Sequence, residues 1–105
     1  MLPALLSEFV GTFIFVSVIL LVTSLYPNNI IVPLIIGLAL AIGIYFAMTT
    51  SLGSLNPAVS IALYARGDLT GSATVMYILA EILGAVLAFM WWRYMTNAKK
   101  CSKSP

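Results

Sequence analysis

The sequence Asn56-Pro57-Ala58 lies inside residues 9–65, which contain no charged residue and no histidine. Asn-Pro is a helix-start signal, because Asn suits the N-cap and Pro suits the first helical position. The apolar run Pro57–Ala65 then predicts a helix of roughly 13 Å, less than half of a bilayer core of about 30 Å. We therefore expect a half-helix that enters a membrane and stops there, against protein or a water-filled cavity.

Asn56 has the chemistry of a hydrogen-bond donor for neutral molecules. As an N-cap, its side-chain oxygen would accept the backbone N–H of Ala58 or Val59, which leaves the NH₂ group directed away from the helix. The helix end behind it carries a partial positive charge. Such a site suits a lone pair of water or an alcohol and repels cations and protons. The alternative is a re-entrant loop that only completes the packing.

Two acidic residues are predicted within membrane helices, where acidic side chains are rare and usually face the bundle interior. Glu8 could accept backbone N–H groups of the irregular segment Thr50–Leu55, or could reach the headgroups from its position near the N-terminus. Glu81 is ten residues into a predicted helix, so we expect it to be buried and either ion-paired or protonated. It could hold the same loop.

The composition indicates an all-α integral membrane protein, since the chain is 62% hydrophobic and only 8% charged. We expect three membrane helices, at about residues 2–24, 31–49 and 72–94, in addition to the re-entrant half-helix. The first run has no basic segment before it and is too long for a secretory signal. These elements form one unit over residues 1–96, followed by a basic tail, 97–105, that we expect to be disordered. We expect it in the cell membrane, plasma or inner.

The same composition argues against several function classes. The chain has one cysteine and no histidine, so we expect no internal disulfide, no metal site and no cofactor. It offers no nucleophile beside a base and no phosphate loop, which disfavours an enzyme. Three lysines on a short tail, Lys99, Lys100 and Lys103, fit an anchor to anionic lipid rather than a nucleic-acid surface.

Small residues recur every four positions on each predicted membrane helix, which favours close helix packing in lipid. The stripes are Ser7 and Gly11 on the first helix, Ala39, Gly43 and Ala47 on the second, and Ala80, Gly84 and Ala88 on the third. The alternative is that Ala and Gly are simply common in membrane helices.

Three blocks of the sequence resemble, in order and spacing, one repeat of the major intrinsic proteins, the aquaporins and glycerol facilitators. The blocks are Ser7–Phe13, Ser54–Val59 and Ala80–Ala85. Members of that family hold two such repeats, inverted in the membrane, with their half-helices meeting end to end. The resemblance implies a half-sized channel subunit that carries the Asn-Pro-Ala (NPA) motif. By the same resemblance, a second constriction would be lined by Ile36, Ile44, Gly53 and Val59.

The chain departs from the family pattern at four positions. Val59 stands where the second repeat usually has an arginine, and Leu52 stands where the loop glycine is usual. Ser54 and Glu81 replace a common histidine and a common glutamine. Without the arginine, the constriction would be apolar and poor in donors, so it would pass water poorly or admit glycerol-like and less polar solutes.

The resulting hypothesis is a passive channel subunit for water or small uncharged solutes, completed by a second inverted half. That half is an antiparallel second copy, in an assembly of one or more such dimers, or a different half-channel chain. Arg93, Lys99, Lys100 and Lys103 belong to one face of the membrane and Arg66 alone to the other, which favours a cytoplasmic tail and one orientation. The three lysines lie beyond the predicted helix end, and on a flexible tail they would count for less. The alternative function is a non-conducting subunit that binds or regulates another membrane protein.

Overall fold

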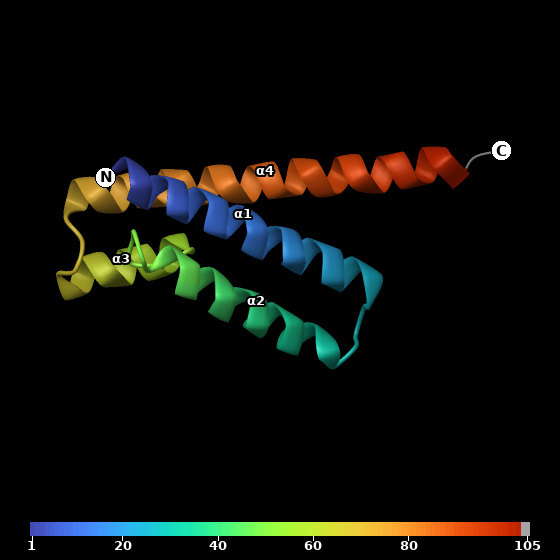
Figure 1. Ribbon diagram of the computed structural model, residues 1–105, viewed down its shortest axis with the longest axis horizontal. Coiled ribbons are helices and arrows are strands. Elements are labelled where there is room, and N and C mark those ends of the chain that lie inside the picture. Colours follow the sequence, from blue (N-terminus) through green and yellow to red (C-terminus); the bar gives the residue numbers. More distant parts are fainter. Residues whose placement is uncertain (104–105) are drawn as a thin grey trace.

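The computed structural model describes residues 1–103, which form four helices and no strand. The helices are α1 (Leu2–Leu25), α2 (Ile31–Ala47), α3 (Pro57–Arg66) and α4 (Gly71–Lys103). In Figure 1, α1 and α4 run in the same direction and α2 runs in the opposite direction. The N-terminus and the end of α4 therefore lie at opposite ends of the molecule. The short α3 lies beside the first half of α4.

Helix lengths bear directly on the membrane interpretation. Both α1 and α4 are long and apolar enough to cross a bilayer. The apolar α2 has 17 residues, about 26 Å, which is at the short end of the range for a spanning helix. The 10 residues of α3 extend only about 15 Å, as expected for a half-helix.

Close packing of α4 on α1 depends on Gly84. A Cβ at this position would lie 2.6 Å from the Phe9 carbonyl oxygen and 3.2 Å from Thr12 Cβ. One turn further along, Ala88 is fully buried. The predicted stripe on α4 therefore lies in the interface with α1, where small residues allow the two backbones to approach each other.

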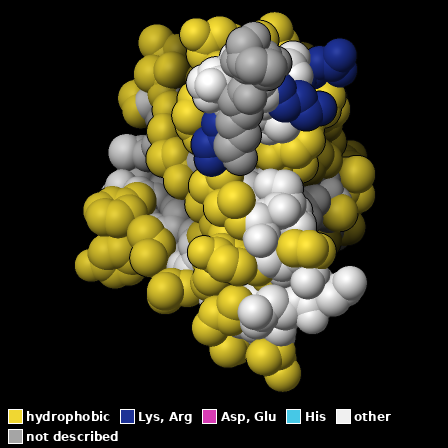
Figure 2. All heavy atoms as spheres, turned by 90° about the vertical axis from the view of Figure 1, so that its right-hand side faces the viewer, with side chains coloured by type: hydrophobic (Ala, Val, Ile, Leu, Met, Phe, Trp, Pro, Cys, Tyr) yellow, Lys and Arg dark blue, Asp and Glu magenta, His cyan; other side chains and the backbone are white. Residues whose placement is uncertain are grey.

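The outer surface is apolar, as in a protein surrounded by lipid. Large hydrophobic side chains are exposed on all three long helices, including Ile14, Leu38 and Val86. Figure 2, which views the end of the molecule that holds the end of α4, shows Lys and Arg side chains gathered near that end above a largely hydrophobic surface. Together these features fit an integral membrane protein with a basic end.

The structure corrects the predicted tail and the end of the last helix. We expected that helix to end near Tyr94 and the tail to be disordered from residue 97, but α4 continues to Lys103. Residues 95–103 contain no Gly or Pro, and Ala98, Lys99 and Lys100 are good helix formers, so nothing stops the helix. Residues 104–105 of the predicted tail lie outside the described part of the chain.

Candidate functional site

The loop after α2 folds back on itself, and Asn56 then begins α3, which runs in the same general direction as α2 (Figure 1). Its backbone is extended (φ −159°, ψ 125°) and its Oδ1 accepts the Ala58 N–H at 2.9 Å. Pro57 occupies the first helical position. At the other end Gly67 takes a left-handed conformation (φ 96°) and its N–H bonds to the Leu63 and Tyr64 carbonyls. Asn56 thus has its oxygen occupied and its NH₂ group available on an exposed residue.

Glu8 of α1 anchors the loop before Asn56. Its side chain is fully buried, and its two oxygens accept from two backbone and two hydroxyl donors. Oε1 accepts the Ser54 N–H at 3.1 Å and the Ser51 hydroxyl at 2.8 Å. Oε2 accepts the Leu55 N–H at 2.7 Å and the Ser54 hydroxyl at 3.1 Å. These bonds satisfy loop donors that have no secondary-structure partner.

Leu55 is a second anchor, which the sequence reasoning missed. Its backbone is left-handed (φ 52°), a conformation that costs a branched or bulky residue roughly 1–2 kcal/mol. The side chain is 2% exposed and packs against two glycines: a Cβ at Gly11 would lie 2.5 Å from Leu55 Cδ2, and one at Gly43 would lie 3.0 Å from Cδ1. The small-residue stripes of α1 and α2 therefore make room for this leucine.

Glu81 of α4 holds the loop and the half-helix together. It is fully buried, and its Oε1 lies 2.6 Å from Ser54 Oγ and 2.7 Å from Ser60 Oγ. The two serine hydroxyls are themselves 2.7 Å apart. Ser60 is also fully buried. Sequence reasoning did not single it out, although a serine inside the apolar run of the half-helix was a signal that could have found it.

Further polar contacts support the loop from both sides. Ser51 Oγ accepts the Gly53 N–H at 3.0 Å, and the Tyr77 hydroxyl of α4 accepts the Leu52 N–H at 3.4 Å. Near the start of α1, the hydroxyls of Ser7 and Thr50 contact each other. The loop is thus bonded to α1 and α4 over most of its length.

The four residues assigned to the constriction do not form a closed ring within this chain. Gly53 (φ 64°) lies against α2, with its Cβ position 3.4 Å from Ile44 Cγ2. Ile36 is half-buried two turns away on α2, and Val59 is 40% exposed on α3. Within residues 1–103, α2 and α3 do not pack against each other. Asn56, Ala58 and Val59 therefore face an open side of the molecule.

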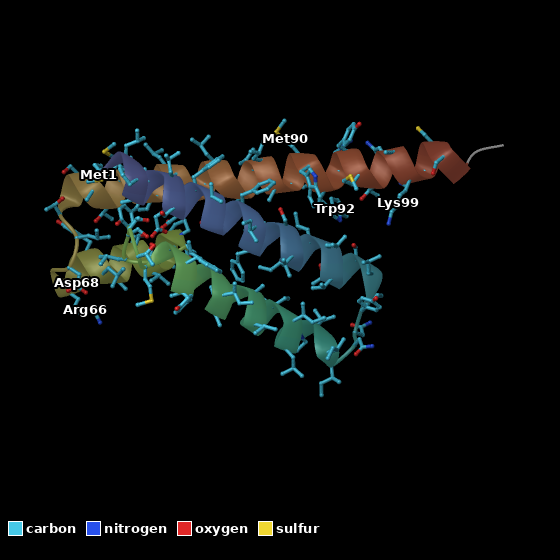
Figure 3. All side chains as sticks on the ribbon, viewed as in Figure 1. Met1, Arg66, Asp68, Met90, Trp92 and Lys99 are labelled. Carbon is cyan, nitrogen blue, oxygen red and sulfur yellow. The ribbon has the colours of Figure 1, made fainter. Side chains whose placement is uncertain are left out.

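The exposed charged groups lie toward the two ends of the bundle. Arg66 and Asp68 form an exposed ion pair beside the end of α3, at the same end as Met1, whereas Lys99 lies toward the other end (Figure 3). Among the described residues, no group of three or more His, Cys, Asp and Glu side chains is placed to hold a metal ion.

Known proteins similar to this chain are named aquaporins. Probable aquaporin TIP4-1 of Oryza sativa subsp. japonica is 34% identical over 106 residues, covering 90% of this chain and 42% of the relative. Aquaporin TIP2-3 of Arabidopsis thaliana is 31% identical, with 93% and 44% covered. Aquaporin-10 of Milnesium tardigradum is 36% identical, with 79% and 22% covered.

The chain thus spans less than half the length of these curated relatives. No solved structure matches it. The sequence model of the family described as Major intrinsic protein matches residues 1–104, nearly the whole chain. Taken with the capped half-helix and its anchored loop, this match shows that the chain belongs to the major intrinsic protein family.

Proposed function

We propose that this chain is one half of a passive membrane channel for water or small uncharged solutes. The observation that carries the proposal is Asn56, which caps a half-helix with its oxygen and is exposed on the open side of the molecule. Its NH₂ group and the positive end of α3 then act on the same passing molecule, donating to a lone pair and opposing cations. In this proposal α2 is the third membrane helix and the protein lies in the plasma or inner membrane.

The pore needs a second half, because α3 extends only about 15 Å into a core of roughly 30 Å. Two half-helices meeting end to end would fill that depth. We propose that the second half is another copy of this chain in the opposite orientation. A two-fold axis in the membrane plane would bring the open side of each copy, including Asn56 and Val59, against the other.

The distribution of basic residues opposes this pairing. Arg66 lies at one end, and Arg93, Lys99, Lys100 and Lys103 follow in the second half of α4. Because α4 is helical to Lys103, these four charges cannot be discounted as part of a flexible tail. They favour a single orientation, in which case a differently charged half would complete the pore.

Cysteine labelling from each side of the membrane separates the two arrangements. Cys101 is exposed, so reporters are placed in a Cys101→Ser background at Ile30 and Ser72, exposed residues before α2 and at the start of α4. Labelling of each site from both sides supports antiparallel copies. Labelling of each site from one side only rejects them and points to a second chain.

Flux through liposomes that contain only this chain tests the channel proposal. We expect osmotic shrinkage above that of empty liposomes, and loss of this flux or a new cation leak in Asn56→Asp, which keeps a cap acceptor but replaces the donor with a negative charge. Unchanged flux without leak in inserted Asn56→Asp protein would reject the role of Asn56.

The structure offers less surface for the alternative, a non-conducting subunit that binds or regulates another membrane protein. A stripe of small residues such as that on α4 could also bind a partner helix, but here Gly84 lies against α1 and Ala88 is fully buried. The alternative would be favoured if correctly inserted protein passes no water, glycerol or urea, both alone and together with a second half-channel chain.

A further inference from the structure

Glu8 and Glu81 approach the same hydroxyl group, Ser54 Oγ, in the interior of the protein. Both carboxyl side chains are fully buried. Arg66 is in an exposed ion pair beside the end of α3, and the other four basic residues begin at Arg93, about 18 Å further along α4 than Glu81. Two ionised carboxylates in an apolar interior without a counter-charge are strongly disfavoured. The pair therefore needs a proton.

Counting hydrogens leads to the same result from geometry. Ser54 Oγ lies 3.1 Å from Glu8 Oε2, 2.7 Å from Ser60 Oγ and 2.6 Å from Glu81 Oε1. Ser60 Oγ also lies 2.7 Å from Glu81 Oε1. The two hydroxyls supply two hydrogens for these four contacts, so with both carboxyls ionised, two oxygen pairs would meet without a hydrogen between them.

A third hydrogen on Glu81 Oε1 completes a directed chain and leaves one of the four contacts, Ser54 Oγ to Glu81 Oε1, without its own hydrogen, where the two ionised carboxylates would leave two. Glu81 then donates to Ser60 Oγ, and the Ser60 hydroxyl donates to Ser54 Oγ. The Ser54 hydroxyl is left to donate to Glu8 Oε2. Every member of this chain donates once, and it ends on the carboxylate that also accepts the loop N–H groups.

The surroundings of the two carboxyls decide which one holds the proton. Both oxygens of Glu8 accept from backbone N–H groups, which can only donate, and two such bonds favour the ionised form of Glu8. Glu81 Oε2 is buried without a partner, a position better suited to the carbonyl oxygen of a neutral acid than to half of a carboxylate. The other titratable group nearby is the Tyr77 hydroxyl, one turn before Glu81, which accepts the Leu52 N–H.

We infer that Glu81 is a protonated positioning residue, which donates through Ser60 and Ser54 to an ionised Glu8 and so locks the loop that presents Asn56. Loss of the proton would leave contacts without hydrogens on both sides of Asn56, in the loop and in α3. The position of Asn56 is therefore coupled to one buried proton. The effect on flux rests on the proposed channel function, whereas the protonation itself does not.

Infrared spectroscopy of the wild-type protein in liposomes tests the protonation directly. The chain has three acidic side chains, and Asp68 is in an exposed ion pair, so a carboxylic-acid carbonyl band has few sources. We expect this band at neutral pH and its loss in Glu81→Gln. Absence of the band from the wild type, or its persistence in Glu81→Gln, would overturn the inference without any assay of flux.

A matched pair of variants tests the division of roles. The amide of Glu81→Gln can donate to both Ser54 and Ser60, so flux should stay within about twofold of wild type, whereas Glu8→Gln sets an NH₂ group against loop donors and should lower flux by about tenfold or more. At alkaline pH, wild-type flux should fall where the band disappears, and Glu81→Gln flux should not. If Glu81→Gln and Glu8→Gln lower the flux of inserted protein equally, the assignment of the proton to Glu81 is refuted. The expected band in a wild type without flux would reject the channel proposal alone.

Discussion

Glu8 and Val10 are two residues apart on α1, yet they lie on opposite faces of this helix and meet different neighbours. Glu8 bonds to four groups of the loop. Val10 lies in an apolar groove of about 610 Å³ between α1 and α2, lined by residues such as Ile14, Ile42 and Phe46. One face of α1 is thus held by directional hydrogen bonds, and the other meets its neighbour loosely through apolar surface.

This difference follows from the solvent. In lipid there is no hydrophobic drive to bring apolar faces together, so van der Waals contact and polar bonds determine the packing. In the proposed channel the loop has to hold Asn56 in one place, and hydrogen bonds to a buried carboxylate specify position more sharply than apolar contacts do. The face of α1 that positions the site is therefore the polar one.

The largest expected effect comes from removing the anchor of the polar face. Glu8→Ala leaves the Ser54 and Leu55 N–H groups without acceptors, at about 1–3 kcal/mol each. We expect a loss of about 2–6 kcal/mol in the free energy of unfolding, by the same reasoning, and a loss of flux. The measurement is denaturant unfolding in detergent, followed by circular dichroism.

Ser17, further along the same helix, is the control for this experiment. Its Oγ is also buried but has no hydrogen-bond partner, so Ser17→Ala removes no bond and should be neutral or slightly stabilising. If Glu8→Ala and Ser17→Ala lower the free energy of unfolding equally, hydrogen bonds to the loop are not what makes the two faces of α1 differ.

A smaller effect is expected where α4 contacts α1. In Gly84→Ala the added Cβ would lie 2.6 Å from the Phe9 carbonyl oxygen, which is backbone and cannot rotate away. Separating the helices to relieve this contact should lower stability by about 1–3 kcal/mol. The thermal midpoint in detergent measures the change.

Gly37→Ala on α2 is the matched substitution. No atom lies within 4 Å of the Cβ it would add, so the better helix propensity of alanine should stabilise α2 by roughly 0.5–1 kcal/mol. Changes of the same sign in the two variants would contradict the view that Gly84 sets the approach of α4 to α1.

The local features of the site could be predicted from sequence because they depend on neighbouring residues. Asn-Pro determined the start of α3, and Gly67 its end. The presence of Glu8 and Glu81 in apolar helices indicated buried polar roles, since charged groups are costly in lipid. The family's three blocks gave the order of the helices.

The tertiary features could not be predicted in the same way. That Leu55 takes a left-handed backbone and packs between Gly11 and Gly43 depends on how α1, α2 and the loop meet. The same holds for Ser60, whose bond to Glu81 joins residues from different helices. The helical extension to Lys103 was missed because the tail was expected to be disordered, although residues such as Ala98, Lys99 and Lys100 favour helix.

The smallest effect on stability is expected at Val59. This residue lies on the open side of the molecule, in the half-helix that the polar face of α1 helps to position. It is 40% exposed, so Val59→Arg should not unfold the protein, yet it adds a charged donor and would narrow the apolar constriction of the proposed pore. We expect glycerol flux to fall more than water flux, because the larger solute meets the narrower opening first. Val59→Leu is the control, since it adds bulk without a donor and should change the ratio of glycerol to water flux less. If Val59→Arg lowers both fluxes in proportion, or changes neither, Val59 does not line the constriction.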